Sequence, residues 1–148
     1  MEKHEYVVVG TGVAGTSAAA AVREHDEQAS ITLLGEEEMP LYSRIMLPRY
    51  IGGEIQREGL QIRRPEWYLE QKINLVTGVR AESLDAGEKH LSLSDGSVLG
   101  YERLLLATGA RCFVPPVEGA ELPGILTLRT MKDADRIRKW CDGVNTAL

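Results

Sequence analysis

Three glycines with a fixed spacing form the pattern in this chain that most directly indicates ligand binding. Gly10, Gly12 and Gly15 make a G-x-G-x-x-G motif. In such a motif the first glycine permits a tight turn, the second lets the backbone touch a pyrophosphate, and the third lets a helix press against a strand. The helix that follows offers free N–H groups and its positive dipole end to the phosphates. The motif predicts pyrophosphate binding by Gly10, Gly12, Val13, Ala14 and Gly15, and packing of a helix onto a strand without any ligand stays an alternative.

An acidic residue follows at the distance that a nucleotide-binding fold requires. Glu36 comes 21 positions after Gly15 and directly follows an apolar run and a glycine. A carboxylate at this distance accepts hydrogen bonds from an adenosine ribose, and it selects a free 2′-hydroxyl over a 2′-phosphate. We expect Glu36 to take this role and its neighbours Glu37 and Glu38 to be solvated.

A second phosphate-binding pattern competes for the same glycines. A loop of the G-x-x-x-x-G-K-[ST] type would begin at Gly10, but Thr16 occupies its lysine position. That lysine is the cation that reaches the terminal phosphates of a nucleotide. The sequence therefore does not favour a nucleoside triphosphatase.

The elements that must position these residues alternate between strands and helices. A β-branched strand at 6–9 leads into the glycine loop, and an Ala-rich helix is predicted at 16–24. Further strands are predicted at 30–34, 73–78 and 103–110, the last of them buried, and Pro65 marks the first turn of another helix. Residues 79–101 are typical of an antiparallel ribbon with turns at 85–87 and 95–96. We expect an α/β, Rossmann-like fold with a parallel sheet and an inserted antiparallel β-ribbon.

Composition narrows the classes of function. The 148 residues include 17 Lys and Arg against 22 Asp and Glu, and the net charge of −5 argues against nucleic-acid binding. No apolar run reaches the roughly 18 residues that a membrane span needs. Cys112 and Cys141 are 29 positions apart, so neither a cysteine zinc site nor a neighbouring dithiol is expected. We expect no metal site, assign no catalytic acid, base or nucleophile, and expect a cytoplasmic setting.

The order of the motifs resembles the FAD-containing pyridine-nucleotide oxidoreductases, in particular the branch of rubredoxin and ferredoxin reductases, NADH oxidases and the flavin domain of nitrite reductases. The matching pieces are the loop at 10–15, Glu36, Leu41-Tyr42-Ser43-Arg44, Trp67-Tyr68 with Ile73-Asn74-Leu75, and Ala107-Thr108-Gly109-Ala110. No cysteine precedes Cys112, so the cysteine pair of the disulfide-reductase branch is absent.

The resemblance implies FAD as the cofactor and a Rossmann-like FAD-binding fold. It places the pyrophosphate on the 10–15 loop and the adenosine ribose at Glu36. It also places Val79 beside the adenine through backbone groups. Finally, it places three residues near the pyrophosphate and the ribityl chain, namely Ala107, Thr108 and Gly109.

Two arginines complete the implied site. Arg44 matches an arginine that runs beside the pyrophosphate and the flavin, and Arg49 falls where the family often has a lysine close to the isoalloxazine ring. A cation there would stabilise negative charge on the reduced flavin. The family often has Pro-Pro where this chain has Ile45-Met46. Both arginines also fit ordinary surface cations.

The resemblance further implies a division of the chain and an activity. Residues 1–114 would be the N-terminal segment of an FAD-binding domain, and residues 115–148 the crossover and start of a truncated NAD(P)-binding domain. The complete enzyme would pass electrons from NAD(P)H through the flavin to a rubredoxin, a ferredoxin or a small molecule, and this chain alone is expected to be an inactive fragment. An NAD-dependent dehydrogenase domain and a non-catalytic nucleotide-binding subunit stay open as alternatives.

Overall fold

The structure is a computed structural model that describes residues 2–143. The chain packs as two compact units. The first unit consists of Met1–Tyr42 and Arg63–Gly109, and the second consists of Ser43–Ile62 and Ala110–Leu148. The predicted division at residue 114 stays a prediction.

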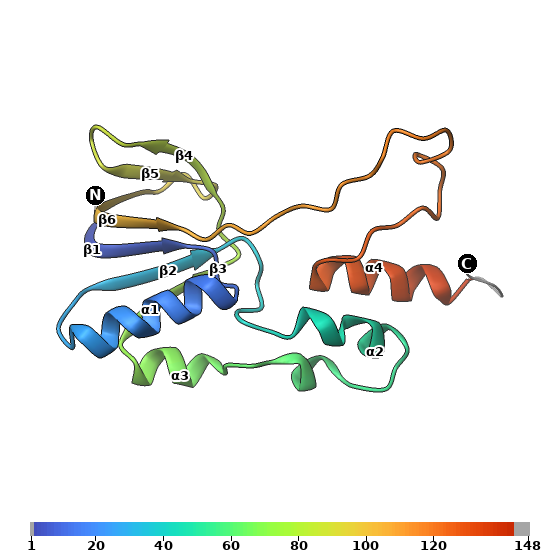
Figure 1. The fold of residues 1–148 in the computed structure, drawn as a ribbon, viewed down its shortest axis with the longest axis horizontal. Coiled ribbons are helices and arrows are strands. Elements are labelled where there is room, and N and C mark those ends of the chain that lie inside the picture. Colours follow the sequence, from blue (N-terminus) through green and yellow to red (C-terminus); the bar gives the residue numbers. More distant parts are fainter. Residues whose placement is uncertain (1, 144–148) are drawn as a thin grey trace. The chain divides into compact units, whose positions relative to one another are not determined.

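The first unit is built on one mixed sheet (Figure 1). Its strands, in the order β3-β2-β1-β6-β5-β4, are β1 (Glu2–Val9), β2 (Ile31–Gly35), β3 (Ile73–Thr77), β4 (Ala81–Asp85), β5 (His90–Leu93) and β6 (Val98–Leu106). Strand β1 pairs in parallel with β2 and β6, and β2 pairs in parallel with β3. The β4–β5 and β5–β6 pairs are antiparallel. The predicted fold class, a parallel sheet with an inserted antiparallel ribbon, is confirmed.

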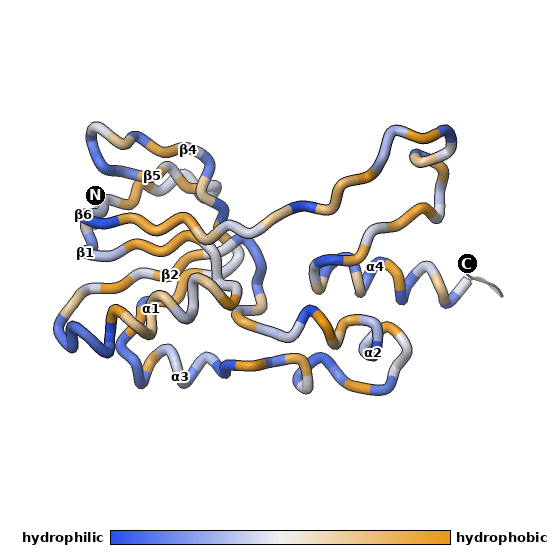
Figure 2. The backbone as a smooth tube through the Cα atoms, in the orientation of Figure 1, coloured by the Kyte–Doolittle hydropathy of each residue, from blue (hydrophilic) through white to orange (hydrophobic). Residues whose placement is uncertain are grey.

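Two helices, α1 (Val13–His25) and α3 (Pro65–Glu70), pack on one face of the sheet. Their apolar residues Ala19 and Tyr68 join Val8, Ile31 and Leu33 in one buried cluster. Because side chains alternate along a strand, the residues on either side of Val8 point to the opposite face. Figure 2 shows hydrophobic residues concentrated along β1 and β6, and for β1 this agrees with a strand whose two faces are covered.

The antiparallel ribbon supplies the core on the other face. Val7 and Val9 of β1 pack there with Leu34 of β2 and with Leu91 and Leu99 of the ribbon. The ribbon turns fall where they were predicted, between β4 and β5 and between β5 and β6. Asp85 and Asp95 stabilise these turns by accepting hydrogen bonds from the backbone two residues ahead, at 2.9 Å each.

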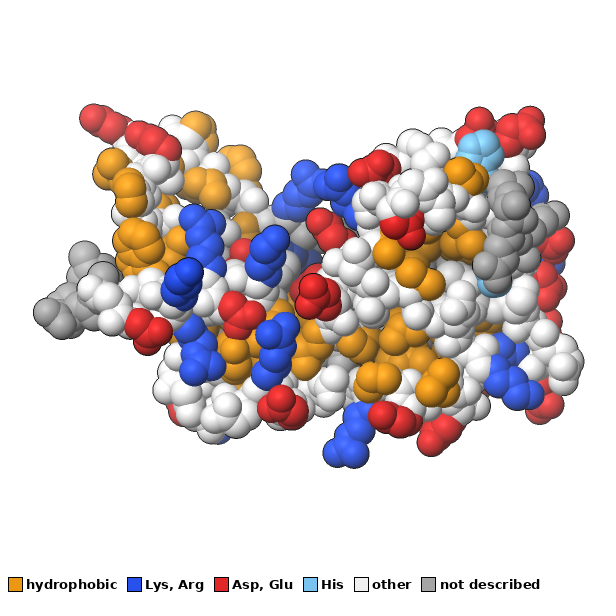
Figure 3. Space-filling view, turned by 180° about the vertical axis from the view of Figure 1, so that it is seen from behind, with side chains coloured by type: hydrophobic (Ala, Val, Ile, Leu, Met, Phe, Trp, Pro, Cys, Tyr) orange, Lys and Arg blue, Asp and Glu red, His pale blue; other side chains and the backbone are white. Residues whose placement is uncertain are grey.

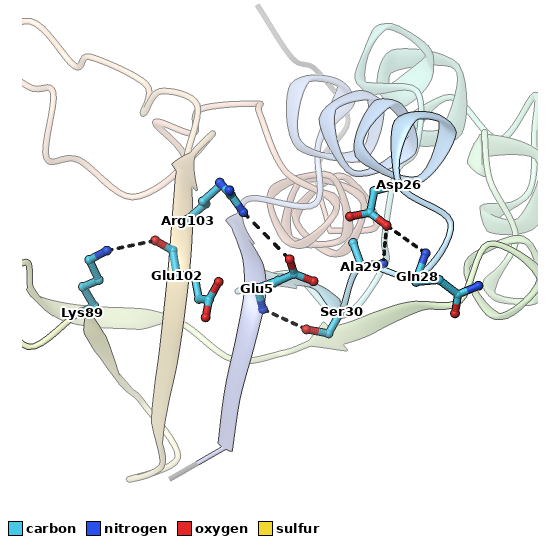
Figure 4. Close-up of polar contacts among 8 residues, drawn as sticks. All are labelled: Glu5, Asp26, Gln28, Ala29, Ser30, Lys89, Glu102 and Arg103. Carbon is cyan, nitrogen blue, oxygen red and sulfur yellow. Dashed lines mark hydrogen bonds and ion pairs between the residues drawn. The ribbon is translucent and has the colours of Figure 1, made fainter.

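Polar contacts connect the strands at their amino ends (Figure 4). The Glu5 N–H donates to Ser30 Oγ at 2.8 Å, so the residue before β2 is held against β1. Asp26 accepts from the N–H groups of Gln28 and Ala29, both at 3.0 Å, and thereby closes the turn between α1 and β2. These contacts do not involve the carboxyl ends of the strands, where the residues predicted to bind the cofactor lie.

The start of α1 differs from the prediction. The helix begins at Val13 and not at Thr16, because Gly12 is the extended N-cap residue and the Thr16 N–H already donates to the Gly12 carbonyl at 3.0 Å. The third glycine of the motif therefore lies inside the first helical turn. Ala-rich composition marked the body of the helix but not its first turn, which has no residue of high helix propensity other than Ala14.

The last strand also differs from the prediction. The ribbon and the final parallel strand are one continuous element, β6, whose first residues pair with β5 and whose later residues pair with β1. It ends at Leu106, so a strand is present within 103–110 and a glycine turn follows it, as predicted. Leu105 and Leu106 are 42% and 56% exposed, so the expectation that this strand is buried is wrong. Leu105 is the pairing partner of Val8 and therefore points to the helix face of the sheet. Within residues 2–143, the buried cluster under α1 and α3 contains no side chain from β6, so Leu105 stays exposed.

The second unit joins α2 (Leu47–Ile51) to α4 (Met131–Cys141) through polar side chains. The Tyr50 hydroxyl donates to Asp135 at 2.7 Å, and this hydrogen bond raises the pKa of Tyr50 above its ordinary value. Arg138 lies over the Tyr50 ring at 4.6 Å, and Arg57 contacts the second Asp135 oxygen at 3.4 Å. Short 3-10 turns at Arg44–Met46 and Arg57–Leu60 flank α2.

Candidate nucleotide-binding site

The glycine loop lies between β1 and α1, and two of its glycines are fixed by the protein itself. Gly10 has a φ of +119°, and a side chain there would overlap the Ala107 carbonyl oxygen. A side chain at Gly15 would overlap the Gly10 carbonyl oxygen and press on Val8. These close approaches bring β1, β6 and α1 together at the loop.

Gly12 is different, because nothing in the protein occupies the space of its missing side chain. No heavy atom of a described residue other than its chain neighbours lies within 4 Å of a Cβ built there. Its φ of −76° is one that any residue adopts. The absence of a side chain therefore leaves open space beside the backbone, as close approach of a ligand requires.

The N-terminus of α1 is suited to an anion. The N-cap Gly12 makes no side-chain capping bond, and the first turn contains no acidic residue. Val13 and Ala14 are both exposed. The first N–H groups of a helix have no partner within the helix, and they attract negative charge. The loop thus combines free donors with the open space at Gly12.

Glu36 lies next to this loop. It directly follows β2, whose Leu34 carbonyl accepts from the Gly10 N–H at 2.7 Å. Gly35 lies so close to the Thr11 side chain that an added Cβ would come within 2.7 Å of Thr11 Oγ1. The Glu36 side chain is exposed. Thr11 of the glycine loop and Gly35, the residue before Glu36, are therefore in direct contact.

The remaining predicted residues of the first unit lie at the same end of the sheet (Figure 1). The Val79 N–H donates to the Gly35 carbonyl at 3.1 Å, and the Ala107 N–H donates to the Val9 carbonyl at 2.7 Å. Thr108 and Gly109 follow in the turn that touches Gly10, and Gly109 has a φ of +74°. The carboxyl ends of β1, β2, β3 and β6 meet here because these strands are parallel.

The two predicted arginines belong to the second unit. Arg44 Nη1 donates to the Arg129 carbonyl at 2.6 Å. Arg49 forms an ion pair with Glu54 at 2.8 Å, with both side chains more than half exposed. The structure thus brings together the predicted residues of the loop and the strand ends, and it describes Arg44 and Arg49 only within their own unit.

Two further interactions in the first unit were not predicted. The Tyr42 hydroxyl donates to Glu37 at 2.5 Å, so Glu37 is not simply solvated as expected. Arg23 of α1 donates to the carbonyls of four residues in two turns, Asp26, Ala29, Gln71 and Lys72. The spacing of these residues in the sequence has no periodicity that would have predicted either interaction.

The described residues, 2–143, contain neither a metal-binding cluster nor a membrane-spanning helix. No group of three or more His, Cys, Asp or Glu side chains in that range could hold a metal ion. None of the helices described there is both long enough and apolar enough to cross a membrane.

Comparison with known proteins agrees with the motifs. A family model of the pyridine nucleotide-disulphide oxidoreductases matches residues 4–142. A ferredoxin–NAD(+) reductase subunit of the benzene 1,2-dioxygenase system of Pseudomonas putida is 34% identical over 131 residues, covering 88% of this chain and 32% of the relative. Rhodocoxin reductase of Rhodococcus erythropolis is 36% identical over 132 residues, covering 88% and 31%.

A solved structure extends the likeness to three dimensions. NADH:rubredoxin oxidoreductase from Clostridium acetobutylicum matches with a TM-score of 0.84 and 27% identity, covering 95% of this chain and 36% of that one. The chain spans about a third of the length of each of these relatives. The matched family region contains the glycine loop, Glu36 and the 107–109 turn. The chain therefore belongs to the pyridine nucleotide-disulphide oxidoreductase family.

Proposed function

We propose that this chain is the FAD-binding portion of an NAD(P)H-dependent oxidoreductase that passes electrons from nicotinamide through flavin to an acceptor. The observation that carries the proposal is Gly12, where the loop needs no glycine for its own packing yet leaves open space. The free helix terminus beside it suits a pyrophosphate. Glu36, exposed at the end of the neighbouring strand, suits the ribose of the same dinucleotide.

In this proposal different residues bind different parts of the cofactor. The loop of Gly10, Gly12, Val13, Ala14 and Gly15 holds the pyrophosphate, and the donors are the N–H groups at the start of α1, because the Gly10 N–H is bonded to the Leu34 carbonyl. Glu36 accepts hydrogen bonds from the ribose hydroxyls. The backbone of Val79 borders the adenine, and the turn of Ala107, Thr108 and Gly109 follows the pyrophosphate toward the ribityl chain.

Arg44 and Arg49 are proposed to contribute positive charge near the pyrophosphate and the flavin ring. For Arg49 this role requires release from Glu54, with which it is paired in the free chain. FAD, when bound, would supply the redox chemistry, and the protein would orient it and tune its charge.

NAD(P)H is the proposed electron donor of the complete enzyme, and a rubredoxin or a ferredoxin the proposed acceptor. Two relatives support this acceptor, since one is a ferredoxin–NAD(+) reductase subunit and the other an NADH:rubredoxin oxidoreductase. Residues 39–64 carry five arginines against Glu54 and Glu58, a local charge of +3 that would attract an acidic partner. Figure 3 shows Lys and Arg side chains interspersed with Asp and Glu on the surface. Rates of acceptor reduction that do not change with ionic strength would contradict electrostatic docking.

We also propose a cytoplasmic setting. Cys112 and Cys141 are exposed and form no disulfide with each other. Exposed thiols of this kind persist in a reducing compartment.

The proposal is tested by titrating the purified chain with FAD and following flavin fluorescence. A hydrogen bond to a charged group contributes about 1.5–3 kcal/mol, so Glu36→Ala should weaken FAD binding at least about tenfold. Glu38→Ala, two positions further on, is the matched control and should bind like the wild type. Equal losses in the two variants, or displacement of FAD by NAD at similar concentration, would contradict the proposal.

A further inference from the structure

Glu36 is the middle residue of the segment 35–37, whose backbone is hydrogen-bonded on both sides of Glu36. Before it, the Gly35 carbonyl accepts from the Val79 N–H at 3.1 Å, and Gly35 packs on Thr11. After it, the Glu37 carbonyl accepts from the Gly78 N–H at 3.4 Å. The exposed carboxylate thus extends from a backbone that is fixed at its two neighbours.

A side-chain hydrogen bond between Tyr42 and Glu37 also holds this segment. The hydroxyl donates to the carboxylate at 2.5 Å, within the range of short, charge-assisted hydrogen bonds. Tyr42 is 5% exposed, and its neighbour Leu41 is buried and bonded through its carbonyl to the Arg63 N–H at 3.4 Å. The donor is therefore among the buried residues of the first unit.

The three consecutive glutamates at 36–38 differ in exposure and in hydrogen bonding. Glu37 is half-buried and turned to Tyr42, whereas Glu36 and Glu38 are exposed. Glu37 is thus held by Tyr42, and Glu36, the glutamate that follows β2 directly, is exposed to solvent. A carboxylate that is already oriented loses less conformational freedom when it binds.

We propose that Tyr42 and Glu37 form a positioning pair that orients Glu36 toward the ribose hydroxyls of the adenosine half of the cofactor. This inference rests on the proposed function. Neither member of the pair contacts the cofactor, so the effect of each on binding passes through Glu36.

The test is a set of FAD titrations of the complete 148-residue chain. Tyr42→Phe removes only the hydroxyl and should weaken FAD binding about fivefold to tenfold. Glu37→Ala should do the same, and Glu37→Gln should recover part of the loss because its amide oxygen still accepts from Tyr42. Glu38→Gln and Tyr101→Phe, which removes another buried tyrosine hydroxyl, are the controls and should bind like the wild type.

A double-mutant comparison separates positioning from general destabilisation. In a Glu36→Ala background, Tyr42→Phe should cause no further loss of FAD affinity, because the residue it positions is gone. A loss of the same size with and without Glu36, or no loss in Tyr42→Phe alone, would overturn the positioning role and leave the proposed function intact. Absence of FAD binding by the wild-type chain would overturn the proposed function and the pair's role with it.

Discussion

At the scale of single residues, one added methyl group has opposite consequences at different positions of the glycine loop. At Gly15 it would overlap a carbonyl oxygen of the protein, and at Gly12 it would meet open space. The packing of the protein therefore requires a glycine at position 15 but not at position 12. This difference provides a direct test of ligand binding.

We predict that Gly12→Ala leaves the free energy of unfolding within about 0.5 kcal/mol of the wild type. The same change should weaken FAD binding at least about tenfold, because the methyl group takes the space that the pyrophosphate needs. Gly15→Ala is the counterpart and should destabilise the chain by about 1–3 kcal/mol, since backbone must move. Denaturant unfolding and flavin titration measure the two quantities. Unchanged FAD affinity in Gly12→Ala would show that the loop only packs.

Arg23 is a residue whose importance only the structure reveals. Its guanidinium donates to the carbonyls of Asp26 and Ala29 before β2 and of Gln71 and Lys72 before β3, at 2.8–2.9 Å. It therefore closes two chain segments onto α1. Lysine cannot reproduce this fork of donors.

We predict that Arg23→Ala lowers the free energy of unfolding by about 2–3 kcal/mol and that Arg23→Lys recovers less than half of it, because hydrogen bonds to a charged group are worth about 1.5–3 kcal/mol. The control is Arg80→Ala, which removes an exposed ion pair with Glu82 and should cost at most about 1 kcal/mol. Urea unfolding of the three variants compares them. Similar losses at positions 23 and 80 would contradict the prediction.

At the scale of elements, local patterns were sufficient for the strand–loop–helix unit and for the ribbon turns. Val7 to Val9, the glycine motif and the Asp-Gly turns each act over a few residues, so their sequence is enough to predict them. Helix α2 was missed because it is short and stands in a segment with Pro48 and two glycines. Its partner α4 is about 85 residues away, as the Tyr50–Asp135 bond shows. Short patterns carry no information about such a distant contact.

The start of α4 is fixed by a capping box of Thr130 and Asp133. Asp133 N–H donates to Thr130 Oγ1 at 3.2 Å, and the Asp133 carboxylate accepts from the Thr130 N–H at 2.8 Å. Burial of the Asp133 carboxyl raises its pKa, but hydrogen bonds from Thr130 and Arg129 outweigh this effect, so the pKa is lowered overall. The charged form is therefore the one that caps the helix.

A lowered pKa in the folded state fixes the direction of the pH dependence of α4. We predict that the cap contributes fully above the unfolded pKa of about 3.8 and is lost as the pH falls through the lower folded value. Thr130→Ala should reduce helix stability by about 1 kcal/mol at pH 6. Asp133→Asn should reduce the change between pH 6 and pH 2. The ¹³Cα shifts of Met131–Cys141 report the helix, and equal pH dependence in wild type and Asp133→Asn would contradict the prediction.

At the scale of the whole molecule, charge and motifs are unevenly distributed. The first unit has 8 Lys and Arg against 15 Asp and Glu, a net −7, and the second has 9 against 7, a net +2. The chain contains a single G-x-G-x-x-G motif. Reduction of a flavin by NAD(P)H requires that two dinucleotides be held at once. The proposed site accounts for one of them, and the sequence given contains no second loop of this type.

Retention of FAD by this chain depends on how much of the isoalloxazine ring it covers. We propose that, in the complete enzyme, other segments supply part of that cover. Each Å² of apolar surface left in water forfeits about 25 cal/mol, so roughly 100 Å² would cost about 2.5 kcal/mol. This corresponds to nearly a hundredfold in dissociation constant. We therefore expect the purified chain to contain little FAD and to bind added FAD weakly.

We predict that the 148-residue chain does not turn over NAD(P)H even when FAD is added. Hydride transfer requires the donor and acceptor atoms to be held about 3–3.5 Å apart, and positioning of this kind contributes about 7–11 kcal/mol of the barrier. A chain with one dinucleotide loop can orient the flavin but not the nicotinamide. The measurement is a steady-state assay with FAD, NADH and ferricyanide, compared with the same mixture lacking protein. Turnover well above that of free FAD would show that one loop suffices, and the chain would then be an enzyme in its own right.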